Sequence, residues 1–229
     1  MTVEDTAGAS LRSAWLAGDV LDAALRVSLR DLNARFLDCL RRMPEEELEL
    51  LGFVPAVARL LRATDAHSTL LIAACPYALF DAAFRRHEYW HAMCAGAGAG
   101  TVAVSGEDAA LPPEHQQEYV TLTEMALFFA WHLATTNLLA TRLVLGMSTA
   151  TAELIRSSTL PAITGAVRTR RRLLRPRWPE RTLFWRRLLA ITPQSSFEEA
   201  TVAQLTGIQL MATEECLEQL PAATASKRR

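Results

Sequence analysis

Residues 87–91 read His-Glu-Tyr-Trp-His, which matches the H-E-x-x-H pattern of zinc peptidases. On a helix, His87 and His91 would lie on one face and could bind zinc, while Glu88 could serve as the general base. A catalytic zinc also needs a third protein ligand. The longer peptidase pattern lacks its third His here, Cys94 stands where that pattern has Gly, and two arginines directly precede the motif. The sequence therefore favours two ordinary helix histidines and no metal site, with a zinc peptidase as the enzymatic alternative.

A second group that could do chemistry is the arginine-rich segment 168–187, which holds nine arginines and one acid, Glu180. If the segment is helical, several arginines recur on one face that could contact DNA phosphates. The candidate DNA-binding residues are Arg168, Arg170, Arg171, Arg172, Arg175 and Arg177. Trp178 and Trp185 interleave with them, and we expect core anchors rather than base-stacking platforms. Alternatively, the arginine face docks on the acidic residues 45–49 or on a partner protein, or is only solvated.

The distribution of charge also indicates a basic surface in the second half of the chain. The net charge is −1. Residues 1–124 carry 10 arginines and 18 acidic residues, a net −8, whereas residues 125–229 carry 14 basic and 7 acidic residues, a net +7. This asymmetry predicts an anionic partner for the second half, or electrostatic docking of one half on the other.

Composition narrows the class of protein. The chain has 229 residues, half of them apolar, which is enough for a sizeable core. Four singly spaced cysteines and an acidic, polar start without a signal peptide predict a cytoplasmic protein. The apolar stretch 125–146 is interrupted by polar residues, so we expect a core helix and no membrane span. The Gly-rich segment 94–113 does not have the form of a phosphate-binding loop, and we predict no cofactor.

Hydrophobic periodicity and helix-boundary residues predict an all-α fold. Residues 19–43 are expected to form a long amphipathic helix that Pro44 ends, and Asp65 is the expected N-cap of a later helix. Residues 114–145 are expected to form one continuous core helix.

Residues typical of helix N-termini also occur in the second half of the chain. Thr159 and Pro161 are expected to open a helix. The Ser-x-x-Glu box from Ser196 to Glu199 predicts the start of a C-terminal helix that reaches about Leu220, with a break near Gly207.

The most informative pattern is an internal repeat. LGFVPAVARLLRAT (51–64) aligns with LGMSTATAELIRSS (145–158) at an offset of 94, and RHEYWHAMC (86–94) aligns with RTLFWRRLL (181–189) after one residue of slippage. Trp90 meets Trp185 in this alignment, whereas the possible zinc ligands meet Thr182, Leu183 and Arg186. A fold that keeps the tryptophan and loses the histidines does not need the histidines.

The repeat predicts two similar multi-helix units joined by a Gly-rich linker. The expected divisions are a first unit at 1–93, a linker at 94–113, a second unit at 114–192, and C-terminal helices with a frayed tail at 193–229.

The repeated unit resembles FlhD, a subunit of the bacterial flagellar transcriptional master regulator. The resemblance rests on the long-helix segment DLNARFLDCL (31–40), the turns LGF (51–53) and LGM (145–147), and Thr-Leu-Pro (159–161) before the basic, aromatic end LLRPRW (173–178). It covers roughly residues 19–85 and 125–180, and implies an all-helical transcription factor component that works with a zinc-binding partner subunit. This chain differs by carrying two tandem copies, which could mimic a dimer within one chain.

These observations together predict a cytoplasmic, non-enzymatic transcriptional regulator or regulator subunit, with catalytic and metal residues both absent. The resemblance implies an activator in flagellar regulation. The expected partners are DNA and either a second regulator subunit or another copy of the chain, without a membrane. One alternative is a helical protein–protein interaction or assembly protein that does not bind DNA, and the other is the zinc peptidase.

Overall fold

The computed structural model describes residues 21–95, 113–169 and 173–219. Within these ranges the chain forms helices and one two-stranded sheet, which confirms the predicted all-α class. The first elements are α2 (Ala23–Arg42), α3 (Glu45–Leu50), α4 (Pro55–Ala63), α5 (Ala66–Ile72), β1 (Phe80–Asp81) and α6 (His87–Cys94). They are followed by α7 (Pro113–Thr136), α8 (Leu138–Leu145), α9 (Thr149–Ser157), α10 (Leu160–Thr169), β2 (Arg175–Pro176), α11 (Thr182–Leu189) and α12 (Phe197–Gln219). None of the described helices is both long and apolar enough to cross a membrane.

Capping side chains determine where several helices begin. Asp22, Asp65, Asn137 and Ser148 each accept a hydrogen bond from the backbone N–H three residues further along the chain. These bonds satisfy N–H groups that have no partner within the helix. The prediction that Asp65 is an N-cap is confirmed. The prediction of one continuous helix over 114–145 is wrong, because α7 ends at Thr136 and the Asn137 cap starts α8.

The C-terminal helix α12 begins at the predicted capping box. The Ser196 N–H donates to Glu199 Oε2 at 2.8 Å, and the Glu199 N–H donates to Ser196 Oγ at 3.2 Å. The expected break near Gly207 is wrong, since α12 continues through it. A Cβ atom at position 207 would overlap the ring and hydroxyl of Tyr77. The glycine therefore permits a close helix approach and does not end the helix.

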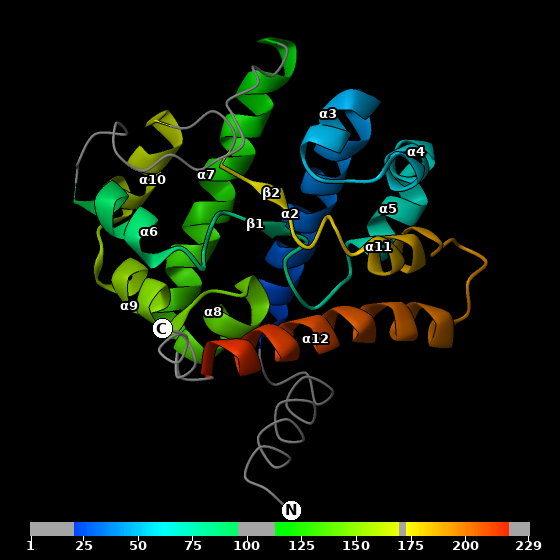
Figure 1. The fold of residues 1–229 in the computed structure, drawn as a ribbon. Coiled ribbons are helices and arrows are strands. Elements are labelled where there is room, and N and C mark those ends of the chain that lie inside the picture. Colours follow the sequence, from blue (N-terminus) through cyan, green and yellow to red (C-terminus); the bar gives the residue numbers. More distant parts are fainter. Residues whose placement is uncertain (1–20, 96–112, 170–172, 220–229) are drawn as a thin grey trace, which may run out of the picture.

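Two long antiparallel helices, α2 and α7, lie at the centre of the molecule (Figure 1). The Arg42 side chain at the end of α2 pairs with Glu118 near the start of α7, with 2.6 Å between Nη2 and Oε1. Helices α4 and α5 pack on α2, and helices α9 and α10 pack on α7. Each long helix thus carries the short helices that follow it in the sequence.

The last helix of each unit packs on the other unit. Helix α6 contacts α9 and α10, and α11 contacts α4 and α5. Strands β1 and β2 pair antiparallel, with Phe80 opposite Pro176 and Asp81 opposite Arg175. The buried apolar residues of both units form one continuous cluster. The two units therefore share a single core.

Corresponding positions of the two units have the same local geometry. Ala83 and Trp178, 95 residues apart, both have positive φ angles, of 56° and 54°. The indole N–H of Trp90 donates to the Ala82 carbonyl at 3.1 Å, and that of Trp185 donates to the Arg177 carbonyl at 3.2 Å. These local matches, and the packing of α6 on α9 and α10 and of α11 on α4 and α5, recur at positions that the repeat pairs. Helix α12 has no counterpart among residues 21–95 of the first unit.

Candidate binding groove and charged cluster

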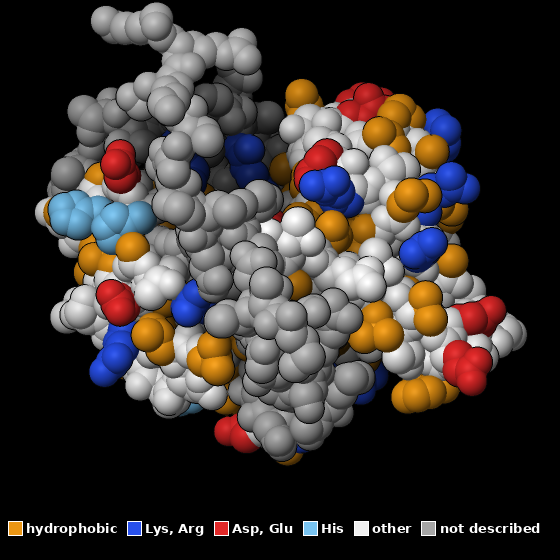
Figure 2. All heavy atoms as spheres, turned by 60° about the horizontal axis from the view of Figure 1, so that its bottom comes forward, with side chains coloured by type: hydrophobic (Ala, Val, Ile, Leu, Met, Phe, Trp, Pro, Cys, Tyr) orange, Lys and Arg blue, Asp and Glu red, His pale blue; other side chains and the backbone are white. Residues whose placement is uncertain are grey.

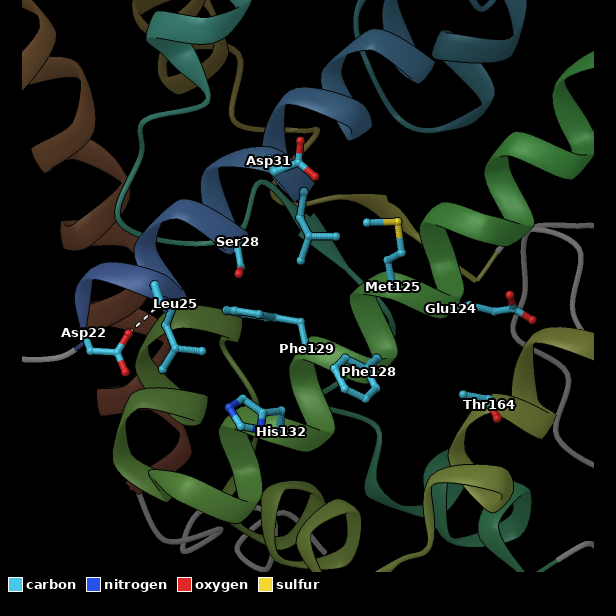
Figure 3. A pocket seen from close by; sticks show the side chains of 12 residues that line it. Asp22, Leu25, Ser28, Asp31, Glu124, Met125, Phe128, Phe129, His132 and Thr164 are labelled. Carbon is cyan, nitrogen blue, oxygen red and sulfur yellow. Dashed lines mark hydrogen bonds between the residues drawn. The ribbon is translucent and has the colours of Figure 1, made fainter.

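A groove with a volume of about 750 Å³ lies between the first half of α2 and the second half of α7 (Figure 3). Its apolar lining consists of Ala24, Leu25, Leu32, Met125, Phe128 and Phe129. Its polar lining consists of Asp22, Ser28, Asp31, Glu124, His132 and Thr164. Leu25 and Phe129 point toward each other across the groove from the two helices. We call this feature the α2–α7 groove.

Helical periodicity places these side chains on facing surfaces. Met125, Phe128, Phe129 and His132 recur at i, i+3, i+4 and i+7 along α7, which brings them onto one face. Phe128 is 51 % exposed, which is unusual for a large aromatic side chain. Its ring stacks on the His132 ring, with 6.5 Å between centroids. The α7 wall of the groove therefore presents an aromatic surface to solvent.

The rim of the α2–α7 groove is acidic. Among the described residues that line it, Asp22, Asp31 and Glu124 carry carboxylates, and neither Lys nor Arg is present. Asp22 accepts the capping bond from the Leu25 N–H, and Asp31 pairs with Arg35 at 2.8 Å, with both of these side chains more than half exposed. Arg35 offsets the charge of Asp31, and Asp22 and Glu124 leave the described rim with a net negative charge.

At the equivalent end of the same helix pair, described side chains bridge α2 and α7. A shift of 94 residues maps Phe128, Phe129 and His132 onto Ala34, Arg35 and Asp38. At this end the Arg42–Glu118 ion pair bridges α2 and α7. Tyr119, which corresponds to Leu25, is buried, and its hydroxyl donates to the Leu174 carbonyl. The positions that correspond to Phe128, Phe129 and His132 thus carry a small residue and two charged ones, so the repeat itself does not require the exposed aromatic surface on α7.

The predicted DNA-binding arginines do not form one helical face. Helix α10 ends at Thr169, and Arg175 lies in β2, so the expected helical spacing is interrupted. The side chain of Arg168 and residues 170–172 lie outside the described residues, and the structure neither brings them together nor separates them. Arg175 is partly buried.

Arg177 is not on the surface, and its assignment to a DNA-contacting face is wrong. Its side chain is 5 % exposed, and its Nη2 lies 3.3 Å from Glu214 Oε2. Its Nη1 donates to the Val144 carbonyl at 3.3 Å, and its guanidinium lies 4.2 Å from the centre of the Trp178 ring. The guanidinium is already held by these groups, so it cannot contact a phosphate.

Arg177 belongs to a buried charged cluster that anchors α12. Glu214 of α12 also accepts a hydrogen bond from the Trp178 indole N–H at 2.7 Å, and its carbonyl accepts from Arg85 Nη2 at 3.0 Å. Burial lowers the pKa of Arg177, and the nearby Glu214 partly opposes this effect. Burial likewise raises the pKa of Asp81, opposed by hydrogen bonds from the backbone of Phe84 and Ala83. These contacts satisfy the buried charges, and they hold the helix to both units.

The histidine motif lies on a helix, as predicted, and spans the first turns of α6. His91 is exposed, His87 is half-buried, and their ring centres lie 6.1 Å apart. Within the described ranges, no group of three or more His, Cys, Asp or Glu side chains is placed to hold a metal ion. Trp90 between them is fully buried, which fits the core-anchor role expected for it. That the histidines bind no metal stays a prediction.

Other arginines of the segment 168–187 are exposed on α11. Arg186 and Arg187 project from α11, which packs on α4, where Arg59 and Arg62 are also exposed. On the face in Figure 2, basic side chains lie interspersed with acidic and hydrophobic ones, with several on the right-hand side that carries α4 and α11. Sequence reasoning missed the contribution of α4, since its arginines lie more than 100 residues from the arginine-rich segment.

Sequence reasoning also missed the α2–α7 groove. The residues that line it were expected to be core, because apolar side chains at helical spacing are usually buried. No family model, curated protein or solved structure matches the chain in the comparisons made. The resemblance to FlhD therefore stays a prediction, and functional inference rests on the groove, the charged cluster and the exposed arginines.

Proposed function

We propose that this chain is a non-enzymatic subunit of a regulatory complex and that it binds a partner protein in the α2–α7 groove. The observation that carries this proposal is the half-exposed aromatic wall at Phe128, whose counterpart in the repeat is the small Ala34. An apolar cleft rimmed by polar groups is a common form of protein interaction site. The resemblance to FlhD makes transcriptional regulation the setting in which we place the subunit.

Site-specific photo-crosslinking in the native cytosol tests this proposal. A photoreactive amino acid replaces Phe128 in one variant and Leu183 in the control. Leu183 is 69 % exposed on α11, and it does not line the groove. We expect one dominant crosslinked protein from position 128 that position 183 does not yield. Equal products from both positions, or no product from position 128, would contradict the proposal.

Contact with DNA phosphates is the second candidate function. It is supported by the exposed Arg186 and Arg187 on α11, which packs on the helix α4 that carries the exposed Arg62, and by the net positive charge of the second half of the sequence. In this proposal the exposed arginines act together with the arginines of residues 168–172. Each phosphate contact that is lost lowers the salt dependence of duplex binding by about 0.9 in the log–log slope.

Titration of the protein with duplex DNA at several salt concentrations tests this second candidate. The Arg186→Ala, Arg187→Ala double variant is expected to reduce the log–log salt slope of duplex binding by the amount that corresponds to about two phosphate contacts. Arg156→Ala is the matched control, because Arg156 is the exposed counterpart of Arg62 on α9, 94 residues further along. No retention of DNA at low salt, or an equal loss with the control, would remove this candidate.

A further inference from the structure

We propose that the occupant of the α2–α7 groove is a basic amphipathic helix supplied by a partner protein. This inference rests on the proposed function and specifies the chemistry of the partner. It draws on two features of the groove, which are the length of its apolar floor and the position of its carboxylates.

The apolar floor has the length and form that a helix needs. Leu25 and Leu32 lie seven residues apart on α2, a distance of about 10 Å at 1.5 Å per residue, and Met125 to Phe129 face them from α7. Two turns of an incoming helix would place apolar side chains at i, i+3 or i+4, and i+7 along such a floor. The half-buried Leu25 and half-exposed Phe128 are the side chains that such a helix would cover.

The rim determines the charge of the partner. Asp22 and Asp31 lie near the two ends of the floor on α2, whereas Glu124 points from α7 away from α2, toward the side of Thr164 (Figure 3). Carboxylates on both sides of the exposed α7 surface favour Lys or Arg flanking the apolar face of a ligand and repel an acidic one. Nucleic acid does not fit this groove, since neither Lys nor Arg is present among the described residues that line it to neutralise phosphate.

A second copy of the chain fits less well than a basic helix. Two copies that meet through this groove in a symmetric dimer would bring the same acidic rim against itself. Such like-charge contacts cost free energy that an apolar floor of this size must offset. Charge complementarity therefore favours a different protein, and self-association becomes an outcome that the experiment can detect.

The test uses two synthetic helical peptides of 14 residues as probes. Both carry Leu at i, i+3, i+7 and i+10, and the remaining exposed positions are Lys in one and Glu in the other. Fluorescence anisotropy with the full chain measures binding of each at two salt concentrations. We expect the Lys peptide to bind at least tenfold more tightly than the Glu peptide, and this preference to shrink at high salt.

Surface variants locate the binding. Glu124→Lys is expected to weaken binding of the Lys peptide about tenfold and to strengthen binding of the Glu peptide. Phe128→Ala is expected to weaken binding of both peptides. Glu153→Lys is the matched control, because Glu153 is an exposed acid on α9 that does not line the groove. All three substituted side chains are solvent-exposed, so these variants are expected to fold.

Several outcomes would overturn the proposal. These are equal binding of the two peptides, an equal effect of Glu153→Lys, or dimerisation of the chain that Phe128→Ala abolishes. Tenfold tighter peptide binding after removal of residues 1–20 or 221–229 would identify the occupant as a tail of this chain. A crosslinked partner at position 128 without any preference for the Lys peptide leaves the proposed function standing and removes only the charge assignment. Absence of both removes the two together.

Discussion

At the scale of single residues, burial holds two thiols in their neutral form. Desolvation raises the pKa of Cys39 to about 11 and the pKa of Cys75 to about 12. The thiolate is the reactive species, so both groups are inert near neutral pH in the folded protein. Cys94 on α6 is half-buried.

The first prediction concerns thiol reactivity. Titration of the folded protein with a thiol reagent at pH 8 is expected to modify Cys94 before Cys39 and Cys75, which react only after urea unfolds the chain. Peptide mass mapping over time identifies each modified residue. Cys94→Ser is the control that removes the fast phase at this position. Rapid modification of Cys75 without unfolding would contradict the burial described here.

The same pKa of Cys75 predicts a pH dependence of stability. Its value in the folded protein, about 12, lies above the value of about 8.5 expected in the unfolded chain. This difference leaves the free energy of unfolding unchanged below the unfolded pKa, and reduces it as pH rises from there toward the folded pKa. The loss is about 1.4 kcal/mol per pH unit for one thiol. Urea unfolding at pH 7, 8.5 and 10 measures it, and Cys75→Ala should flatten the decline.

Replacement of two helix glycines by Ala is expected to change the free energy of unfolding in opposite directions. Gly207→Ala is expected to lower the free energy of unfolding by about 1–3 kcal/mol, since the new methyl group overlaps Tyr77. Gly165→Ala in α10 meets no atom within 4 Å and is expected to raise it by about 0.5–1 kcal/mol. Thermal unfolding of both variants measures the two shifts. Similar shifts for the pair would mean that α12 does not approach Tyr77 this closely.

At the scale of elements, α12 is held by a few polar contacts as well as by its apolar face. The Tyr77 hydroxyl donates to the Gln204 carbonyl at 3.1 Å. Further along the helix, the Glu214 carboxylate accepts hydrogen bonds from Arg177 and Trp178. These residues come from both units. The helix therefore bridges the two units, and its detachment would expose the buried guanidinium of Arg177.

Loss of Glu214 tests this anchoring. Glu214→Ala is expected to destabilise the protein by about 2 kcal/mol, because Arg177 and the Trp178 indole lose a charged hydrogen-bond acceptor in a buried setting. Glu198→Ala, an exposed acid in the first turn of the same helix, is the control. Hydrogen exchange measured peptide by peptide should show faster exchange in α12 for Glu214→Ala alone. Uniformly unchanged exchange would contradict the anchoring role.

Local signals made part of these elements predictable. The caps at Asp65 and Ser196 and the helical form of residues 87–94 depend on neighbouring residues, so the sequence reveals them. The continuity of α12 at Gly207 depends on Tyr77, a residue 130 positions away, and the burial of Arg177 depends on Glu214. The groove could not be predicted for a similar reason. The exposure of Phe128 on α7 depends on which side chains of α2 lie opposite it.

At the scale of the whole molecule, the two units are coupled because the last helix of each, α6 or α11, packs on the other unit. Because α6 packs on α9 and α10 while α11 packs on α4 and α5, neither unit buries its own tryptophan helix. A single continuous core follows, and it predicts one cooperative unfolding transition for the described residues.

Cutting the chain within the segment between α6 and α7 tests this coupling. Residues 1–105 and 106–229, expressed separately, are each expected to remain unfolded or to aggregate, and to form a folded 1:1 complex when mixed. Circular dichroism and analytical ultracentrifugation measure folding and assembly. As a second check, Trp90→Phe and Trp185→Phe should each lower the midpoint of the same single transition. A fragment that unfolds cooperatively by itself would show that the units are independent.

The fusion of two similar units in one polypeptide also sets the valency of the surface at Phe128. In a homodimer every mutation occurs twice, so two equal clefts would form, and a titration would saturate at two ligands per particle. In this chain the repeat pairs Phe128 with Ala34, so the two positions differ within one polypeptide. The proposed partner helix is therefore expected to saturate at one per polypeptide.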